Sequence, residues 1–197
     1  MPIANRIVAE RSWDYRDRLK SLGIKRLGRG SNAEVFQHPK YKDIVVKVYQ
    51  KTDRDKGEYW LKWCMKHQSN PYVPRLYKIG KLKNLEIDEE DEGYVLSHHI
   101  AFMEKLQKAT KSEIDKMFKT GGALGSVVRF HKWGWDFADE FMEEPDWSPI
   151  TDPHLLEVLK VIYSKSIGED DWESVDMIVS NFMKRPNGRV VFTDPLC

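Results

Sequence analysis

The feature that most constrains the fold is a glycine turn between two short apolar segments, followed by a third apolar segment with a lysine near its centre. The turn reads Gly28-Arg29-Gly30, and the third segment is 43–49, where isoleucine and valine surround Lys47. Strand, turn and strand in this order predict an antiparallel meander. An unpaired ammonium group is costly among apolar side chains. We therefore expect the meander to hold Lys47 next to an anion.

The turn itself has the composition of a phosphate-binding loop. Gly28 and Gly30 have no Cβ, so the backbone N–H groups of such a turn can approach phosphate oxygens closely. An ordinary hairpin is the alternative interpretation of this loop taken alone. The two expected strands that flank it are 24–27 and 34–37, with a second turn at 39–43.

The rest of the first half predicts one helix and two more strands. Residues 55–67 have the apolar spacing of a helix, and 75–82 and 94–103 are strand candidates separated by an acidic run at 86–92. Glu58, early in the helix, is a candidate anion for Lys47. A solvent-facing position for Glu58 is an equally open alternative.

The second half is predicted to be mainly helical. Segments 111–119 and 122–132 look helical, 143–153 is a proline-rich connection, and Thr151-Asp152-Pro153 is a start signal for a helix over 154–166. A shorter amphipathic helix is expected over 8–22. The fold class expected from the sequence is therefore α+β, with a five-stranded antiparallel front half and a helical rear half.

Near the end, the chain has a second group of polar residues with a specific spacing. Asp176 and Asn181 are five positions apart, and Asp194 follows a predicted hairpin of strands 181–184 and 189–193. This hairpin should return Asp194 beside Asn181. Two oxygen ligands that converge in this way suit a hard cation such as Mg²⁺. The alternative is that Asp176 only caps a turn and Asp194 only precedes a proline.

Composition excludes several classes of function. The 32 Lys and Arg residues nearly balance the 31 Asp and Glu residues, so the net charge of +1 gives no reason to expect nucleic acid or a membrane surface as the main partner. Cys64 and Cys197 are the two cysteines, and no long apolar span or cleavable signal is visible. A cytoplasmic protein is expected. The scattered histidines do not suggest a structural zinc site.

These segments together resemble the protein kinase superfamily, and most closely the early serine/threonine kinases of short-tailed lytic bacteriophages. The resemblance covers residues 20–195, and the block after Asp176 is its most specific part. The matching stretches are Leu27-Gly-Arg-Gly30, Gln37-His38-Pro39, Val46-Lys47-Val48, Asp176-Met177 with Asn181-Phe182-Met183, and Phe192-Thr-Asp-Pro195.

The resemblance implies a kinase-like bilobal fold, with an N-terminal helical extension (1–22), an N-lobe (23–106) and a truncated C-lobe (107–197). It implies ATP and Mg²⁺ as cofactors and host bacterial proteins as substrates, phosphorylated on Ser or Thr in the cytoplasm of the infected cell. Asp176 and Lys47 are the implied catalytic residues, and Asn181 and Asp194 the implied metal ligands. The implied nucleotide-binding residues are Gly28, Gly30, Ala33 in place of a third glycine, Val35 over the adenine, Lys47, Glu58 and Glu104.

The chain departs from the kinase pattern in two places. Ser174-Val175 precede Asp176 where most kinases have His-Arg, and three residues follow Asp194, so we expect no activation segment. One alternative is a catalytically impaired kinase-fold protein that binds and inhibits a host or defence protein. Another is a small-molecule phosphotransferase, in which the acidic stretch 136–144 would bind a cationic substrate. A helix with a solvated acidic face is the simpler explanation of that stretch.

Overall fold

The computed structural model describes residues 19–30, 33–50, 56–82, 98–123, 128–131, 134–137, 145–166 and 177–196. The chain divides into two compact units, of which the first comprises Met1–Met65 and Arg75–Lys105, and the second Lys66–Pro74 and Leu106–Cys197. The segment 66–74 therefore belongs with the second half of the chain, although its neighbours on both sides belong to the first unit.

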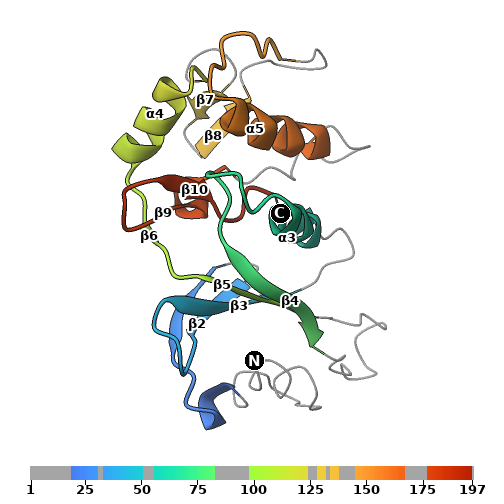
Figure 1. Cartoon of the computed structure of the whole chain (residues 1–197), viewed down its shortest axis with the longest axis vertical. Helices are drawn as coiled ribbons and strands as arrows, with labels where there is room; N and C mark the ends of the chain where they lie inside the picture. The colour runs from blue at the N-terminus through green and yellow to red at the C-terminus, as the bar shows by residue number, and fades with distance from the viewer. Residues whose placement is uncertain are drawn as a thin grey trace. The chain divides into compact units, whose positions relative to one another are not determined.

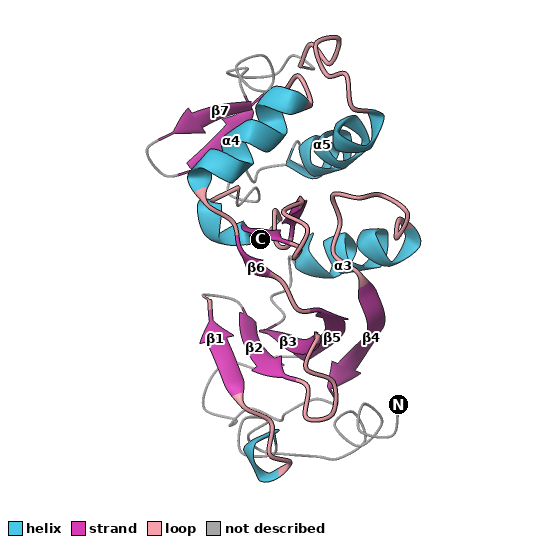
Figure 2. Ribbon diagram, turned by 60° about the vertical axis from the view of Figure 1, so that its left-hand side comes forward, coloured by secondary structure: helices cyan, strands magenta, loops and turns pink. Residues whose placement is uncertain are grey.

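The first unit is built on the five-stranded antiparallel sheet that the sequence predicts (Figure 1, Figure 2). Its strands are β1 (Arg26–Arg29), β2 (Ala33–Gln37), β3 (Ile44–Gln50), β4 (Leu76–Leu82) and β5 (His98–Glu104). Their order across the sheet is β1-β2-β3-β5-β4. Strand β3, which carries Lys47, is thus the central strand, paired with β2 on one side and with β5 on the other.

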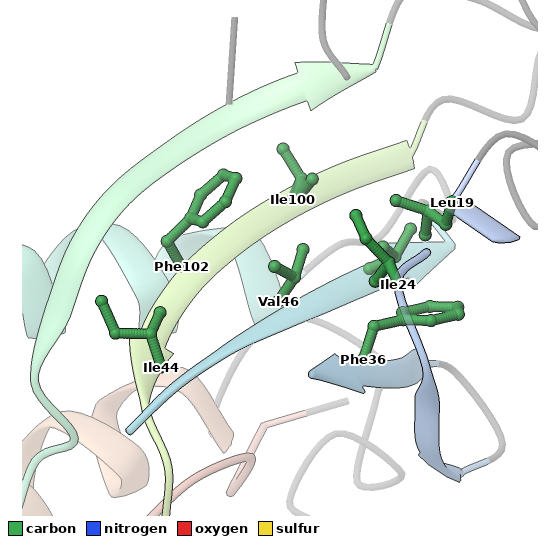
Figure 3. Packing of buried hydrophobic residues seen from close by; sticks show 8 residues of the cluster. Leu19, Ile24, Phe36, Ile44, Val46, Ile100 and Phe102 are labelled. Carbon is green, nitrogen blue, oxygen red and sulfur yellow. The ribbon is translucent and has the colours of Figure 1, made fainter. Parts of the chain in front are cut away.

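One face of this sheet forms the hydrophobic core of the first unit (Figure 3). The core cluster consists of Leu19, Ile24, Phe36, Ile44, Val46, Val48, Ile100 and Phe102. Each such side chain contributes roughly 1.5–3 kcal/mol on full burial. Side chains alternate between the two faces of a strand. Val45, Lys47 and Tyr49 on β3 therefore point to the face opposite Val46 and Val48.

Helix α3 (Lys56–Lys66) follows β3, close to the predicted 55–67. Trp60, Leu61 and Cys64 are buried, and the ring of Trp63 stacks on that of Trp60 with 5.4 Å between centroids. This apolar stripe recurs at helical spacing, which is why a segment with so many charged residues forms a helix here. Burial of the stripe fixes the rotation of α3 and therefore the direction of its polar residues.

In the second unit, helix α4 (Lys111–Thr120) matches the predicted 111–119 and begins with a capping box. The hydroxyl of Thr110 accepts a hydrogen bond from the backbone N–H of Glu113, whose carboxylate accepts one from the backbone of Thr110. Phe118, on the buried side of α4, makes edge contacts with the rings of Phe182 and Phe192, at centroid distances of 5.9 and 6.1 Å. These three rings pack α4 against the hairpin that carries the late polar residues.

That hairpin forms as predicted. Strands β9 (Phe182–Lys184) and β10 (Val190–Phe192) pair antiparallel, and a short strand, β6 (Gln107–Lys108), adds to β9. The connecting turn is closed by a hydrogen bond from the Gly188 N–H to the Arg185 carbonyl, and Gly188 has φ of +84°. A positive φ is the reason for glycine at this position.

Helix α5 (Pro153–Ser166) begins at the predicted start signal. One carboxylate oxygen of Asp152 accepts hydrogen bonds from the backbone N–H groups of His154 and Leu155, and the other accepts one from the Tyr72 hydroxyl at 2.5 Å. The amide of Asn70 donates to the His154 carbonyl at 2.9 Å. Side chains of segment 66–74 therefore hold the first turn of α5.

The prediction of a helix over 122–132 is wrong for its described end. Val128–His131 forms strand β7, which pairs with β8 (Gly134–Phe137). Helix α4 cannot continue, because Gly122 has φ of +81° and ends it. The described part of the second unit thus contains strands β6 to β10 as well as α4 and α5.

The described part of the chain contains no helix that is long and apolar enough to cross a membrane.

Candidate functional site

The polar face of the five-stranded sheet carries Lys47 and the residues around it. In register, Lys47 lies directly opposite Val35 on β2 and Ala101 on β5, and Tyr49 lies opposite His99. Directly opposed residues share a face, with Cβ atoms about 4.5–5.5 Å apart. Lys47 therefore lies in a row of small and apolar side chains on the face away from the core cluster.

Lys47 is buried, with 8% of its surface exposed. Its ammonium group lies over the ring of Tyr49, 4.5 Å from the ring centroid, in a cation–π contact. The structure thus places Lys47 on the polar face of the sheet, and an anion bound beside it stays a prediction.

Helix α3 supplies an acidic side chain to the same face. The carboxylate of Glu58 lies 2.9 Å from the ammonium of Lys62, 3.9 Å from that of Lys81 on β4, and 3.6 Å from Nδ1 of His99 on β5. Because Lys81 and His99 are directly opposed in the sheet, Glu58 must lie over the face that also carries Lys47. Glu58 therefore lies on the side of α3 that faces the sheet, and its side chain does not point to solvent as the alternative interpretation has it.

The charges around Glu58 keep it ionised. Desolvation by burial would raise the pKa of Glu58, but the hydrogen bond from Lys62 and the charges of His99, Lys62 and Lys81 outweigh it, so the pKa is lowered. A carboxylate that is ionised and held by cations from β4 and α3 can attract a further ammonium or steady one against phosphates. This is the property expected of a partner for Lys47.

The predicted glycine turn is shorter in the structure, because Gly28 and Arg29 extend β1 and pair with β2, and the turn begins at Gly30. The Gly30 N–H donates to the Ala33 carbonyl at 2.8 Å, which closes the turn. A Cβ added to Gly28 would meet no heavy atom of the described chain within 4 Å, and one added to Gly30 would only touch the Ala33 carbonyl at 3.7 Å. Neither glycine has a positive φ. Among the described residues, neither packing nor backbone conformation requires glycine at these two positions, whereas close approach of a ligand to the backbone would.

Glu104 is the last residue of β5. The resemblance to kinases implies that it binds nucleotide. Its carboxylate accepts a hydrogen bond from the backbone N–H of Arg75 at 2.9 Å, and its own N–H donates to the Arg75 carbonyl at 2.9 Å. The side chain of Glu104 therefore ties the start of β4 to the end of β5. If a nucleotide binds at the end of β5, it would contact the backbone of this strand and not the carboxylate of Glu104.

In the second unit, the β9–β10 hairpin brings the residue before Asp194 to Asn181. The backbone N–H of Thr193 donates to the Asn181 carbonyl at 2.9 Å, and the Thr193 hydroxyl donates to the same oxygen at 2.8 Å. Asn181 closes the short 3-10 helix Val179–Asn181, and its N–H donates to the Ile178 carbonyl at 2.9 Å. Asp194 therefore directly follows the residue that is bonded to Asn181.

An amide oxygen and a carboxylate fit the donor preference of Mg²⁺, which usually takes one or two carboxylates and completes its shell with water and substrate phosphates. The described residues contain no group of three or more His, Cys, Asp or Glu side chains suited to hold a metal ion by themselves. Asn181 and Asp194 could hold such an ion with phosphate oxygens and water as its other ligands. Asp176, and the acidic stretch at 138–144, lie outside the described residues.

Sequence reasoning missed the residues that connect the predicted ones. His99 appears in the sequence only as one of two adjacent histidines, and Tyr49 only as the end of a strand, yet they lie opposite each other on the face of Lys47. The sequence pattern also assigns no role to Glu34, which lies between Ala33 and Val35. Strand alternation places His99 and Tyr49 on one face, but it does not tell which helix residue covers them.

No family model matches the chain, and no curated protein matches it.

Proposed function

We propose that the chain is an ATP-dependent serine/threonine protein kinase of the phage type, with a kinase-like bilobal fold. The observation that carries the proposal is the placement of Lys47 and Glu58. Lys47 is buried on the third strand of the sheet, and Glu58 comes from the helix that follows this strand and lies over the same face. Protein kinases use a lysine on the third strand and a glutamate on the next helix to hold the nucleotide phosphates.

The glycine turn supports the same assignment. Gly28 and Gly30 lie at the end of β1, a Cβ on Gly28 would touch no atom of the described chain, and Val35, the partner of Gly28, lies opposite Lys47. In kinases a glycine-rich loop at this point of the chain covers the phosphates. We assign the phosphates to Gly28, Gly30 and Lys47, and an apolar contact with the adenine to Val35.

The hairpin supports a metal-assisted transfer. Asn181 and Asp194 would bind Mg²⁺, which neutralises charge on the phosphate oxygens of ATP. In the proposed reaction, the hydroxyl oxygen of a substrate Ser or Thr forms a bond to the γ-phosphorus, and the bond to the bridging oxygen breaks to release ADP. Asp176 orients this hydroxyl and takes its proton, a role assigned from its spacing to Asn181.

The proposed substrates are host bacterial proteins in the cytoplasm of the infected cell. This part rests on the resemblance to the phage kinases and on no contact in the structure. The two other candidates, an inhibitor without catalysis and a small-molecule phosphotransferase, differ from the proposal in a measurable way. The first transfers no phosphate, and the second labels a small molecule rather than protein.

The test is MgATP binding by calorimetry with a non-hydrolysable ATP analogue. Lys47→Ala should weaken binding of the analogue, and Asp194→Ala should remove the dependence of binding on Mg²⁺. Glu113→Gln, a change in α4 that alters a surface ion pair of the second unit, is the matched control and should bind like the wild type. Wild-type protein that binds no nucleotide would refute the proposal.

A further inference from the structure

The glycine turn is tied to the sheet by a buried carboxylate. Glu34 on β2 has a side chain that is 4% exposed, and it accepts a hydrogen bond from a terminal guanidinium nitrogen of Arg26 at 3.2 Å. The Nε of Arg29 lies 3.8 Å from the same oxygen. Burying a carboxylate is costly unless it is paired. Arg29 is the last residue of β1, between Gly28 and Gly30, so Glu34 holds the strand end from which the turn leaves.

An irregularity in β1 allows both arginines to reach Glu34. Residues three apart on a regular strand point to opposite faces. In the β1–β2 pairing the register shifts between Arg26 and Gly28, so that Arg26 lies opposite Phe36 and Arg29 opposite Glu34. Phe36 and Glu34 share a face, and the extra residue in β1 therefore brings both arginines to that face.

This ionic cluster lies on the opposite face from Lys47. Glu34 lies on the side of the core residues Phe36 and Val48, whereas Val35 lies opposite Lys47. Glu34 can therefore hold the end of β1 from the core face of the sheet, and it would not contact a ligand bound on the face that carries Lys47. The side chains of Arg26 and Arg29 are 55% and 66% exposed, so the two arginines pair with Glu34 from the solvent side.

We propose that Glu34 is a positioning residue, which together with Arg26 and Arg29 fixes the glycine turn in the orientation that binds nucleotide phosphates. This inference rests on the proposed function. The turn is short and glycine-rich, and without the pairing it samples more conformations, because glycine restricts the backbone least. Holding it in the binding conformation before the nucleotide arrives reduces the entropy lost on binding.

The experiment measures two quantities on Glu34→Gln, which keeps the size of the side chain and removes its charge. The first is the Kd for a non-hydrolysable ATP analogue with Mg²⁺, and the second is the rate of trypsin cleavage after Arg29, followed by mass spectrometry. We expect the Kd to rise about fivefold or more and cleavage after Arg29 to become faster. Glu113→Gln is the matched control for loss of an ion pair elsewhere and should change neither.

A second variant keeps the test decisive if Glu34→Gln does not fold. Arg26→Gln breaks the shorter ion pair from its exposed end and should weaken nucleotide binding in the same direction. In the double variant with Glu34→Gln, the Kd should rise by less than the product of the two single fold-changes, because both substitutions break the same ion pair.

Three results would overturn the proposal. They are an unchanged Kd in both single variants, an unchanged cleavage rate after Arg29, or independent effects in the double variant. A wild type that binds no nucleotide would refute the proposed function and, with it, the nucleotide role of Glu34. Faster cleavage in Glu34→Gln would in that case still identify the ionic cluster as a restraint on the turn.

Discussion

Replacement of Gly28 by alanine should separate the stability of the protein from its affinity for nucleotide. In the described chain, the added Cβ would meet no heavy atom within 4 Å, and Gly28 has no positive φ. The folded state can therefore accept alanine without displacement of any neighbour. If the turn binds phosphates through its backbone, however, the same methyl group occupies the space into which the phosphates must come.

The expected effect on stability is small and favourable. Alanine restricts the unfolded chain more than glycine does, which stabilises a protein by about 0.4–1 kcal/mol where the native backbone accepts it. For a chain of this size, 1 kcal/mol corresponds to a change of about 2–4 °C in Tm. We therefore expect Gly28→Ala to leave the Tm unchanged or to raise it by a few degrees.

The expected effect on nucleotide binding is large and unfavourable. A hydrogen bond to a charged group contributes about 1.5–3 kcal/mol, so the loss of one N–H contact to phosphate weakens binding on the order of 10- to 100-fold. The assay is calorimetric titration with a non-hydrolysable ATP analogue and Mg²⁺, together with thermal unfolding of the same sample.

Gly23→Ala is the matched control, because it should show the opposite pattern. Gly23 has φ of +70°, and a Cβ there would also meet nothing within 4 Å of the described chain. Alanine in this left-handed conformation costs roughly 1–2 kcal/mol, so its Tm should fall while its affinity stays at the wild-type value. If Gly28→Ala kept wild-type affinity, phosphates do not approach the turn at Gly28. If it lost as much stability as Gly23→Ala, the fold itself requires glycine there.

Three further predictions concern the second unit. Gly122→Ala should lower the free energy of unfolding by at least about 3 kcal/mol, measured by denaturant titration. The reasons are that φ is +81° at Gly122 and that the new Cβ would collide with the Pro149 carbonyl oxygen. A loss below about 1 kcal/mol would contradict this. Tyr72→Phe removes the hydroxyl that donates to Asp152 and should lower stability by about 1.5–3 kcal/mol, seen as a lower Tm, and an unchanged Tm would refute it. Hydrogen bonds from the Lys184 ammonium and from Thr110 lower the pKa of Glu113 from 4.5 to about 2, so the stability that they contribute is present above pH 4.5 and disappears as the pH falls toward 2. The difference in unfolding midpoint between wild type and Glu113→Gln should shrink over that range, and a constant difference would contradict the assignment.

Local sequence signals predicted the two elements that carry the candidate site. The glycine turn and the alternation around Lys47 specify the meander, and Arg185-Pro-Asn-Gly188 specifies the β9–β10 hairpin, because turn residues and strand periodicity act over a few positions. The same local signals are ambiguous for a short apolar run. Residues 128–131 were therefore predicted as helix, although they pair with 134–137 as a strand.

The environment of Glu58 could be predicted only in part. The pairing with Lys62 is an (i, i+4) contact that the sequence of the helix contains. The contacts with Lys81 and His99 depend on which strands lie next to each other in the sheet and on how α3 is rotated over them. Both are set by burial of the tryptophan side of α3, which is a property of the packed unit and not of any short segment.

The central claim is that this chain transfers the γ-phosphate of ATP to protein hydroxyls. The most direct measurement is incorporation of label from γ-labelled ATP into the protein itself and into a bacterial lysate, with and without Mg²⁺, for wild type and Asp176→Ala. The account predicts Mg²⁺-dependent labelling of protein on Ser or Thr that Asp176→Ala abolishes while its affinity for nucleotide is retained. Equal labelling by Asp176→Ala, or no labelling by a wild type that binds MgATP, would contradict it.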